Sequence, residues 1–466
     1  MALSARSAHF SICWDARALP VLTAPYMRYL QARALFHVGI ALKRFRIIPG
    51  FIDAFCRSFW EYTQPVRTTK GATMQPLSDR TASFTDSVIR RMTRISLRYD
   101  AVNLSQGFPD FDPPAKLLKS LEEISKDPAP RYHQYSITWG AQAMRDALAE
   151  KQSRYMGIPI NPDENIVVTC GSTEAMMAAM MTVTNPGDNV VIFSPFYENY
   201  GADTILSGAQ PVYVPLNPPQ FDFDREVLER AFRENRPKAL VLCNPSNPCG
   251  KVFTREELEF IASLCKKYDA YCITDEVYEH IVYAPHKHTY MASIPGMFER
   301  TISCSSLSKT YSITGWRLGY TIASPEITDR IKKVHDFLTV GAAAPLQEAV
   351  ACALKFDQSY YDEVLELYTH KRDLFCGGLD EMGLTHNTPE GAYYVMMDIG
   401  EFGYTSDLEF CEDLARLVKV GAVPGSSFFR EPVNHLIRFH FAKKDDTLLT
   451  ALENLKSLRE KILPRK

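Results

Sequence analysis

The chain has 466 residues, of which 46% are hydrophobic, with a formal net charge of −3 and a pI near 6.4. This length can bury the cores of two or more domains, and the near-neutral charge gives no electrostatic indication of a nucleic-acid partner. The eleven cysteines include no CxxC pair, and no apolar run reaches the roughly 18 residues of a membrane-spanning helix. We therefore expect no disulfide framework, no metal site, no transmembrane segment, and a reducing compartment such as the cytoplasm.

The first 73 residues differ from the rest in charge, with ten Lys or Arg and only three Asp or Glu. Three interpretations stay open: a transit peptide for a mitochondrion or plastid, an upstream extension with Met74 as the true start, or an ordered arm that packs on the protein. Because the motifs described below begin at Asn103, we treat residues 1–83 as a basic N-terminal extension without a catalytic role.

Short β-branched runs alternate with helical stretches such as Arg255–Tyr268 in the middle of the chain. Continuous apolar runs of this length favour strands that are buried on both faces, and strand–helix alternation favours a mainly parallel sheet. The sequence therefore predicts an α/β domain with a seven-stranded sheet. The seven runs are Ile166–Thr169, Asn189–Phe193, Pro211–Val214, Ala239–Cys243, Tyr271–Thr274, Thr301–Cys304 and Gly319–Ala323.

Motif residues follow four of these predicted strands: Gly171, Asn244, Asp275 and Ser305. Ligands of such sheets bind outside the carboxyl ends of the strands, so we expect these residues to border one crevice. After Ala323 the pattern changes. We expect helices at 325–337, 346–368 and 445–462, and strands at 393–398 and 436–442.

Lys309 stands among small hydroxyl residues, and Arg317 follows eight residues later between Gly315 and Gly319. An enzyme that uses pyridoxal phosphate (PLP) needs such a set: an amine to bind the cofactor covalently, hydroxyls and a cation for its phosphate, and glycines for close backbone approach. The segment alone is not decisive, because most lysines are solvated surface charges. The stretch 171–173 adds a second anion-binding pattern at the start of a helical run, although an ordinary helix N-cap has the same pattern.

Seven motifs in one order resemble the class I/II, fold-type I PLP-dependent aminotransferases, especially the kynurenine and glutamine aminotransferase-like branch. The resemblance implies a large PLP-binding domain at 131–345 and a smaller α+β domain formed by 84–130 and 346–466. It also implies PLP as cofactor, amino acids and 2-oxo acids as substrates, and a homodimer with shared active sites. The motifs are 103–110, Tyr135 with 139–140, 171–174, 244–250, 275–278, the Lys309 segment and Arg438.

The resemblance assigns the cofactor phosphate to one group of residues and the ring to another. Tyr135 matches a tyrosine that reaches the phosphate of the neighbouring subunit. Asp275 keeps the ring nitrogen protonated, although a strand-end Asp is also a common helix cap. If Glu276 opens a helix, Tyr278 points into the same pocket. The phosphate group is Gly171, Ser172, Thr173, Ser306 and Arg317, and the ring group is Asp275, Tyr278, Asn247 and Tyr197, with Phe196 as the alternative to Tyr197.

Lys309 and Arg438 carry the reaction in this interpretation. Lys309 is both nucleophile and general base, which requires a pKa lowered by burial and nearby cations. Arg438 lies in an apolar predicted strand, where its partner is either an internal carboxylate or, as the resemblance implies, the α-carboxylate of the substrate. Gly107 and Asn247 complete the implied substrate site.

The function that follows is an aminotransferase that moves an amino group between an L-amino acid and a 2-oxo acid. The branch favours aromatic amino acids, kynurenine, glutamine and methionine as donors, and no second arginine is assigned to a distal carboxylate. One alternative is a carbon–sulfur β-lyase on the same scaffold. A remote alternative is a non-catalytic PLP-fold regulator, but residues 1–73 show no convincing helix–turn–helix pattern.

Overall fold

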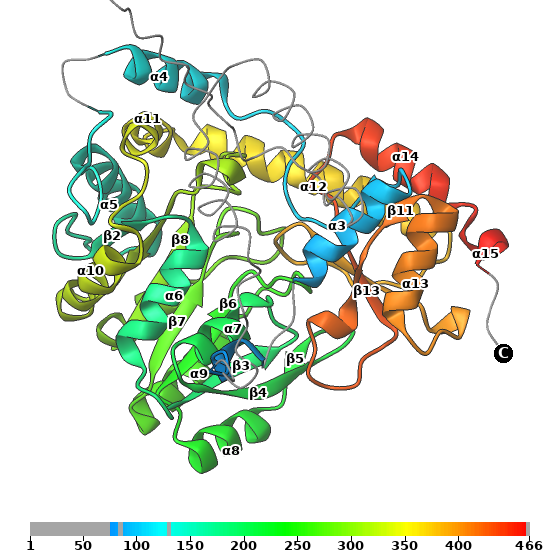
Figure 1. Ribbon diagram of the computed structural model, residues 1–466, viewed down its shortest axis with the longest axis horizontal. Helices are drawn as coiled ribbons and strands as arrows, with labels where there is room; N and C mark the ends of the chain where they lie inside the picture. The colour runs from blue at the N-terminus through cyan, green and yellow to red at the C-terminus, as the bar shows by residue number, and fades with distance from the viewer. Residues whose placement is uncertain (1–74, 83–86, 128–131, 463–466) are drawn as a thin grey trace, which may run out of the picture. The chain divides into compact units, whose positions relative to one another are not determined.

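The computed structural model describes residues 75–82, 87–127 and 132–462 (Figure 1). The chain divides into two compact units after Leu77, and the second unit, from Ser78, holds almost all the described residues. The interpretations of residues 1–73 lie outside the described residues. Within the described ranges, no helix is both long and apolar enough to cross a membrane.

The centre of the second unit is an eight-stranded sheet in the order β2-β9-β8-β7-β6-β3-β4-β5. Strands β3, β4, β6, β7 and β8 pair in parallel, while β9 runs antiparallel to both of its neighbours. The strands are β2 (Ile166–Thr169), β3 (Asn189–Ser194), β4 (Gln210–Asn217), β5 (Asp222–Phe223), β6 (Ala239–Cys243), β7 (Tyr271–Asp275), β8 (Thr301–Ser306) and β9 (Gly319–Ile322).

All seven predicted runs form strands of this mainly parallel sheet, but the predicted number of strands is one too low. The additional strand, β5, has two residues and folds back antiparallel on the end of β4. A pairing this short leaves no periodic pattern in a sequence, which explains why it was missed.

Helices cover both faces of the sheet. On one face, small and apolar side chains of α6 (Ser172–Val183) pack with α7 (Asn199–Leu206) and α10 (Pro325–Thr339) against Val190, Ile273 and Ile302. On the other face, α8 (Arg225–Asn235) and α9 (Arg255–Tyr268) pack against alternate residues of the same strands. The strands are therefore buried on both sides, which is the physical reason for their continuous apolar runs.

The C-terminal part forms a second core with the start of the described chain. An antiparallel sheet of order β10-β13-β12 packs with α3, and β1 pairs in parallel with β11. In contrast, α4 (Ala115–Lys126) packs through Leu117 with α5 (Gln142–Met156) and α11 (Ala344–Leu354), beside which it lies in Figure 1. The elements of the second core are α3 (Val88–Arg98), β1 (Val102–Asn103), α12 (Gln358–Glu381), β10 (Tyr394–Asp398), α13 (Asp407–Asp413), β11 (Val420–Gly421), β12 (Val423–Pro424), β13 (Leu436–His440), α14 (Asp445–Leu455) and α15 (Leu458–Lys461).

Two predicted helices are each divided into two. The predicted helix 346–368 is wrong as a single element, because α11 ends at Leu354 and α12 begins at Gln358 after an extended Asp357. The apolar pattern continues across the break because Phe356 packs edge-on against Tyr360. The predicted helix 445–462 is interrupted by a two-residue turn, Lys456 and Ser457, between α14 and α15.

Candidate active site

A cavity of about 950 Å³ lies where the ends of several sheet strands meet elements of the second core. Its lining includes most of the residues that the sequence predicted for the site. Two predicted residues do not line the cavity. Gly171 lies against the Arg317 guanidinium, and the Tyr135 side chain is 90% exposed. The predicted residues in the lining are Gly107, Ser172, Thr173, Tyr197, Asn247, Asp275, Tyr278, Ser306, Lys309, Arg317 and Arg438.

One end of the cavity is suited to a phosphate. Helix α6 begins at Ser172, so its free backbone N–H groups face the cavity together with the hydroxyls of Ser172 and Thr173. Gly171 has φ 83°, and a Cβ atom there would lie 2.3 Å from a guanidinium nitrogen of Arg317. Glycine at this position therefore lets the arginine lie against the helix start, where guanidinium and N–H groups bind the same anion. The buried Ser308 hydroxyl has no hydrogen-bond partner among the described residues.

Asp275 lines the same cavity at the end of β7 and is only 6% exposed. The Tyr200 hydroxyl donates a 2.7 Å hydrogen bond to its Oδ2. Burial raises the pKa of Asp275, against which the Tyr200 and Val277 hydrogen bonds and the charge of Lys309 act. Tyr200 was not predicted, although it follows Tyr197 by three residues and the two rings pack edge-on with their centroids 5.9 Å apart.

The segment after Asp275 is a turn and contains no helix, so the conditional prediction of a helix from Glu276 is wrong. The Tyr278 side chain still faces the cavity, and its hydroxyl lies 2.8 Å from the hydroxyl of Tyr394. Tyr394 comes from β10 and was not predicted. It also explains Gly107, where a Cβ atom would lie 2.3 Å from the Tyr394 hydroxyl oxygen.

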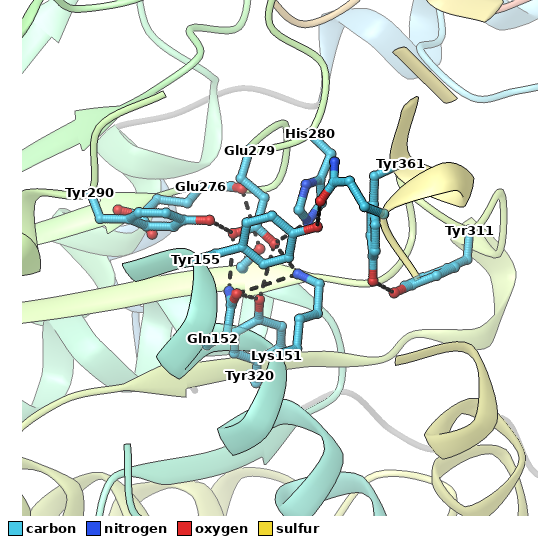
Figure 2. Close-up of polar contacts among 12 residues, drawn as sticks. Lys151, Gln152, Tyr155, Glu276, Glu279, His280, Tyr290, Tyr311, Tyr320 and Tyr361 are labelled. Atoms are coloured by element: carbon cyan, nitrogen blue, oxygen red, sulfur yellow. Dashed lines mark hydrogen bonds and ion pairs between the residues drawn. The ribbon is translucent and has the colours of Figure 1, made fainter. Parts of the chain in front are cut away.

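A buried network of polar side chains stabilises the turn that follows Asp275 (Figure 2). The Lys151 ammonium of α5 lies 2.8 Å from a Glu279 carboxylate oxygen, and the Tyr290 hydroxyl donates to the other oxygen at 2.8 Å. Burial raises the pKa of Glu279, but the charges of Lys151 and His280 and their hydrogen bonds overcome this and hold it well below its usual range. Since a buried carboxylate is costly without such partners, the network fixes the turn one residue beyond Tyr278.

Lys309 extends into the cavity, where its Nζ donates a 3.0 Å hydrogen bond to the Gly107 carbonyl. Burial lowers its pKa to about 8. The charge of Arg317 and, more weakly, that of Arg438 act in the same direction, and Asp275 opposes them. At pH 7 about a tenth of such amines are neutral, compared with less than about one in a thousand at the ordinary pKa. The site thus supplies an amine that can act as nucleophile and base.

Arg438 of β13 is 1% exposed and lies in the lining of the same cavity. Its Nη1 donates to Asn247 Oδ1 at 2.7 Å and its Nη2 to the Ser105 carbonyl at 2.8 Å. In the described part of the chain no carboxylate forms an ion pair with it, and its Nε has no hydrogen-bond partner. The internal carboxylate considered as a possible partner is therefore not found there, and an anion in the cavity would meet an unneutralised guanidinium.

Comparison with known proteins agrees with this arrangement. The family model "Aminotransferase class I and II" matches residues 99–455. The chain is 35% identical to the methionine aminotransferase of Escherichia coli over 373 residues, which is 80% of this chain and 96% of that protein. It is 34% identical to kynurenine–oxoglutarate transaminase 1 of Homo sapiens over 396 residues, 78% of this chain and 93% of that protein.

Among solved structures, N-succinyldiaminopimelate aminotransferase from Mycobacterium tuberculosis superimposes with a TM-score of 0.78 and 35% identity. The match covers 83% of this chain and all of that chain.

Proposed function

The chain belongs to the class I and II aminotransferases, which are PLP-dependent enzymes of fold type I that act on amino acids. We propose that its amino donors are aromatic amino acids, kynurenine, glutamine or methionine. The observation that carries the proposal is Arg438, a buried guanidinium with no ion pair to any described residue, in the same cavity as Lys309. An amino acid presents an α-carboxylate that binds such a guanidinium and an amine that must reach the lysine.

The walls of the cavity support this choice of donor. Aromatic rings of Phe108, Phe196, Tyr197, Tyr278 and Tyr394 line it, and such rings favour apolar or aromatic substrate side chains. Two relatives are named for methionine and for kynurenine, which fit the same chemistry.

The residues around the cavity fit PLP. We propose that Ser172, Thr173, Ser306 and Arg317 hold its phosphate, that Asp275 holds a proton on its ring nitrogen, and that Tyr278 and Asn247 face its phenolic oxygen. Bound PLP supplies an electron-withdrawing ring that acidifies the Cα–H bond of an amino acid. Lys309 Nζ then removes the Cα proton, while Arg438 fixes the α-carboxylate and so the orientation of that bond.

A half-reaction screen tests the proposal. The holoenzyme is mixed with one amino acid at a time, without a 2-oxo acid, and the cofactor absorbance and products are followed. We expect conversion of PLP to pyridoxamine phosphate, fastest with methionine, kynurenine and aromatic amino acids. Conversion with none of these donors would refute the proposed specificity, and release of a thiol and pyruvate from a cysteine conjugate without that conversion would assign the β-lyase instead.

We also propose a homodimer in which each subunit completes the other's site. Tyr135 and Ile137 are exposed on one segment, and Phe337 and Val340 are exposed on a second segment, which the 2.8 Å hydrogen bond between His335 Nε2 and the Thr138 carbonyl joins to the first. Exposed apolar side chains on adjoining segments favour association. Mixed dimers of Tyr135→Ala and Lys309→Ala subunits should regain activity that neither variant has alone. If mixing restored nothing, the shared site would be wrong.

The proposed compartment is the cytoplasm, with a mitochondrion or plastid as the alternative if residues 1–73 direct import. Fluorescent fusions that carry or lack these residues distinguish the two.

A further inference from the structure

Asp203 is a buried carboxyl group of the cavity to which no role has been assigned. It lies on α7, lines the cavity and is 6% exposed. Its Oδ2 is fully buried and has no hydrogen-bond partner among the described residues. An unpartnered buried carboxyl oxygen destabilises a protein unless a ligand supplies what is missing.

The geometry of α7 directs Asp203 toward the same end of the cavity as Asp275. Tyr200 lies three residues earlier, so the two side chains leave the same face of the helix. The Tyr200 hydroxyl reaches Asp275 Oδ2 at 2.7 Å, which fixes that face over the end of β7. Asp203 also interacts electrostatically with Cys304 of β8, the residue that pairs with Asp275 in the sheet.

The charges around Asp203 are unbalanced. Burial raises the pKa of Asp203 to about 7, and the charge of Asp275 adds to this. Burial also raises the pKa of Tyr200 and Cys304, so these two side chains are neutral at pH 7. Of the two carboxyl groups, Asp275 is partly balanced by the charge of Lys309, whereas no cation of the described residues acts on Asp203. Arg317 and Arg438 also line the cavity.

We propose that Asp203 is a positioning residue of the cofactor site, a second carboxyl that acts together with Asp275 on the protonated ring nitrogen of the cofactor. The proposal rests on the proposed assignment of Asp275 to that nitrogen. With the cofactor bound, Asp275 would accept a hydrogen bond from the ring N–H, and an ionised Asp203 in the same cavity would add a second negative charge that favours the protonated ring. At pH 7 about half of the Asp203 side chains carry a proton in the empty site, and this proton would be released to solvent when the positively charged ring binds.

The test compares two ligands that differ only at this nitrogen: PLP and its carbocyclic analogue, in which a C–H group replaces the ring nitrogen. Both keep the aldehyde and the phosphate. Dissociation constants for the apoenzyme are measured by absorbance for the wild type, Asp203→Asn and Asp203→Glu. The matched control is Thr204→Val, which alters a buried side chain of the same helix whose hydroxyl bonds only to the Tyr200 carbonyl.

We expect the wild type to bind PLP more tightly than the analogue, and Asp203→Asn to reduce that preference about tenfold, the equivalent of one pKa unit. Asp203→Glu should restore most of the preference and Thr204→Val should keep it. If Asp203→Asn weakened both ligands equally, Asp203 would serve only the fold and the inference would be overturned. If the carboxamide prevented folding, Asp203→Ser provides the same comparison with a smaller neutral side chain. Failure of the wild type to bind PLP at all would instead refute the proposed function.

Discussion

Replacement of Arg438 by lysine tests the substrate site most directly. The change keeps a positive charge in the pocket but removes the two-pronged donor that now bonds to Asn247 and Ser105. A carboxylate held by both guanidinium nitrogens would lose at least one charge-assisted hydrogen bond. Such a bond contributes about 1.5–3 kcal/mol, so the KM for the amino acid should rise by about tenfold to 150-fold.

The assay is steady-state kinetics with methionine or kynurenine, together with the dissociation constant for PLP. The matched control is Arg430→Lys, since Arg430 also lines the cavity but is exposed and lies over the Tyr213 ring at 5.0 Å. Its KM should change by less than about fivefold, the scale of an exposed ion pair. A loss of PLP affinity in Arg438→Lys with an unchanged KM would refute the reasoning and assign Arg438 to the phosphate or to the fold.

Four further predictions concern the cofactor end of the site and the N-terminal segment. Lys309→Ala should abolish turnover while the folded protein still holds PLP non-covalently, and transamination at the wild-type rate would contradict this. In the wild-type apoenzyme, the rate of covalent PLP capture should increase as the pH rises through about 8, because only the deprotonated Lys309 amine reacts. Asp275→Asn should retain PLP but slow Cα–H exchange of bound amino acid severely, and an unchanged exchange rate would make Asp275 a structural residue only. A protein that starts at Met74 should keep full specific activity and dimer mass, because the cavity lining begins at Ser87; a monomeric or inactive product would make residues 1–73 part of the dimer.

The positions that the sequence predicted well are those that depend on local pattern. Continuous apolar runs located the strands, and the residues just after them, such as Asp275, were predicted to share one edge because parallel strands end together. Tyr200 and Tyr394 were missed for the opposite reason. The partner of each is set by how α7 lies over β7 and how β10 pairs with β13, which are contacts between segments distant in the sequence.

The arrangement of charges links substrate binding to the strength of the base. The charges of Arg317 and Arg438 both help to keep the pKa of Lys309 low, after the larger effect of burial. In the proposed complex the cofactor phosphate neutralises Arg317, and the substrate α-carboxylate neutralises Arg438. Each anion removes part of the repulsion that disfavours a protonated Lys309, so the pKa of Lys309 rises as the site fills. The neutral, nucleophilic form of Lys309 is therefore most accessible while the site is empty, and the Lys309 amine becomes a stronger base when a Cα proton has been placed beside it.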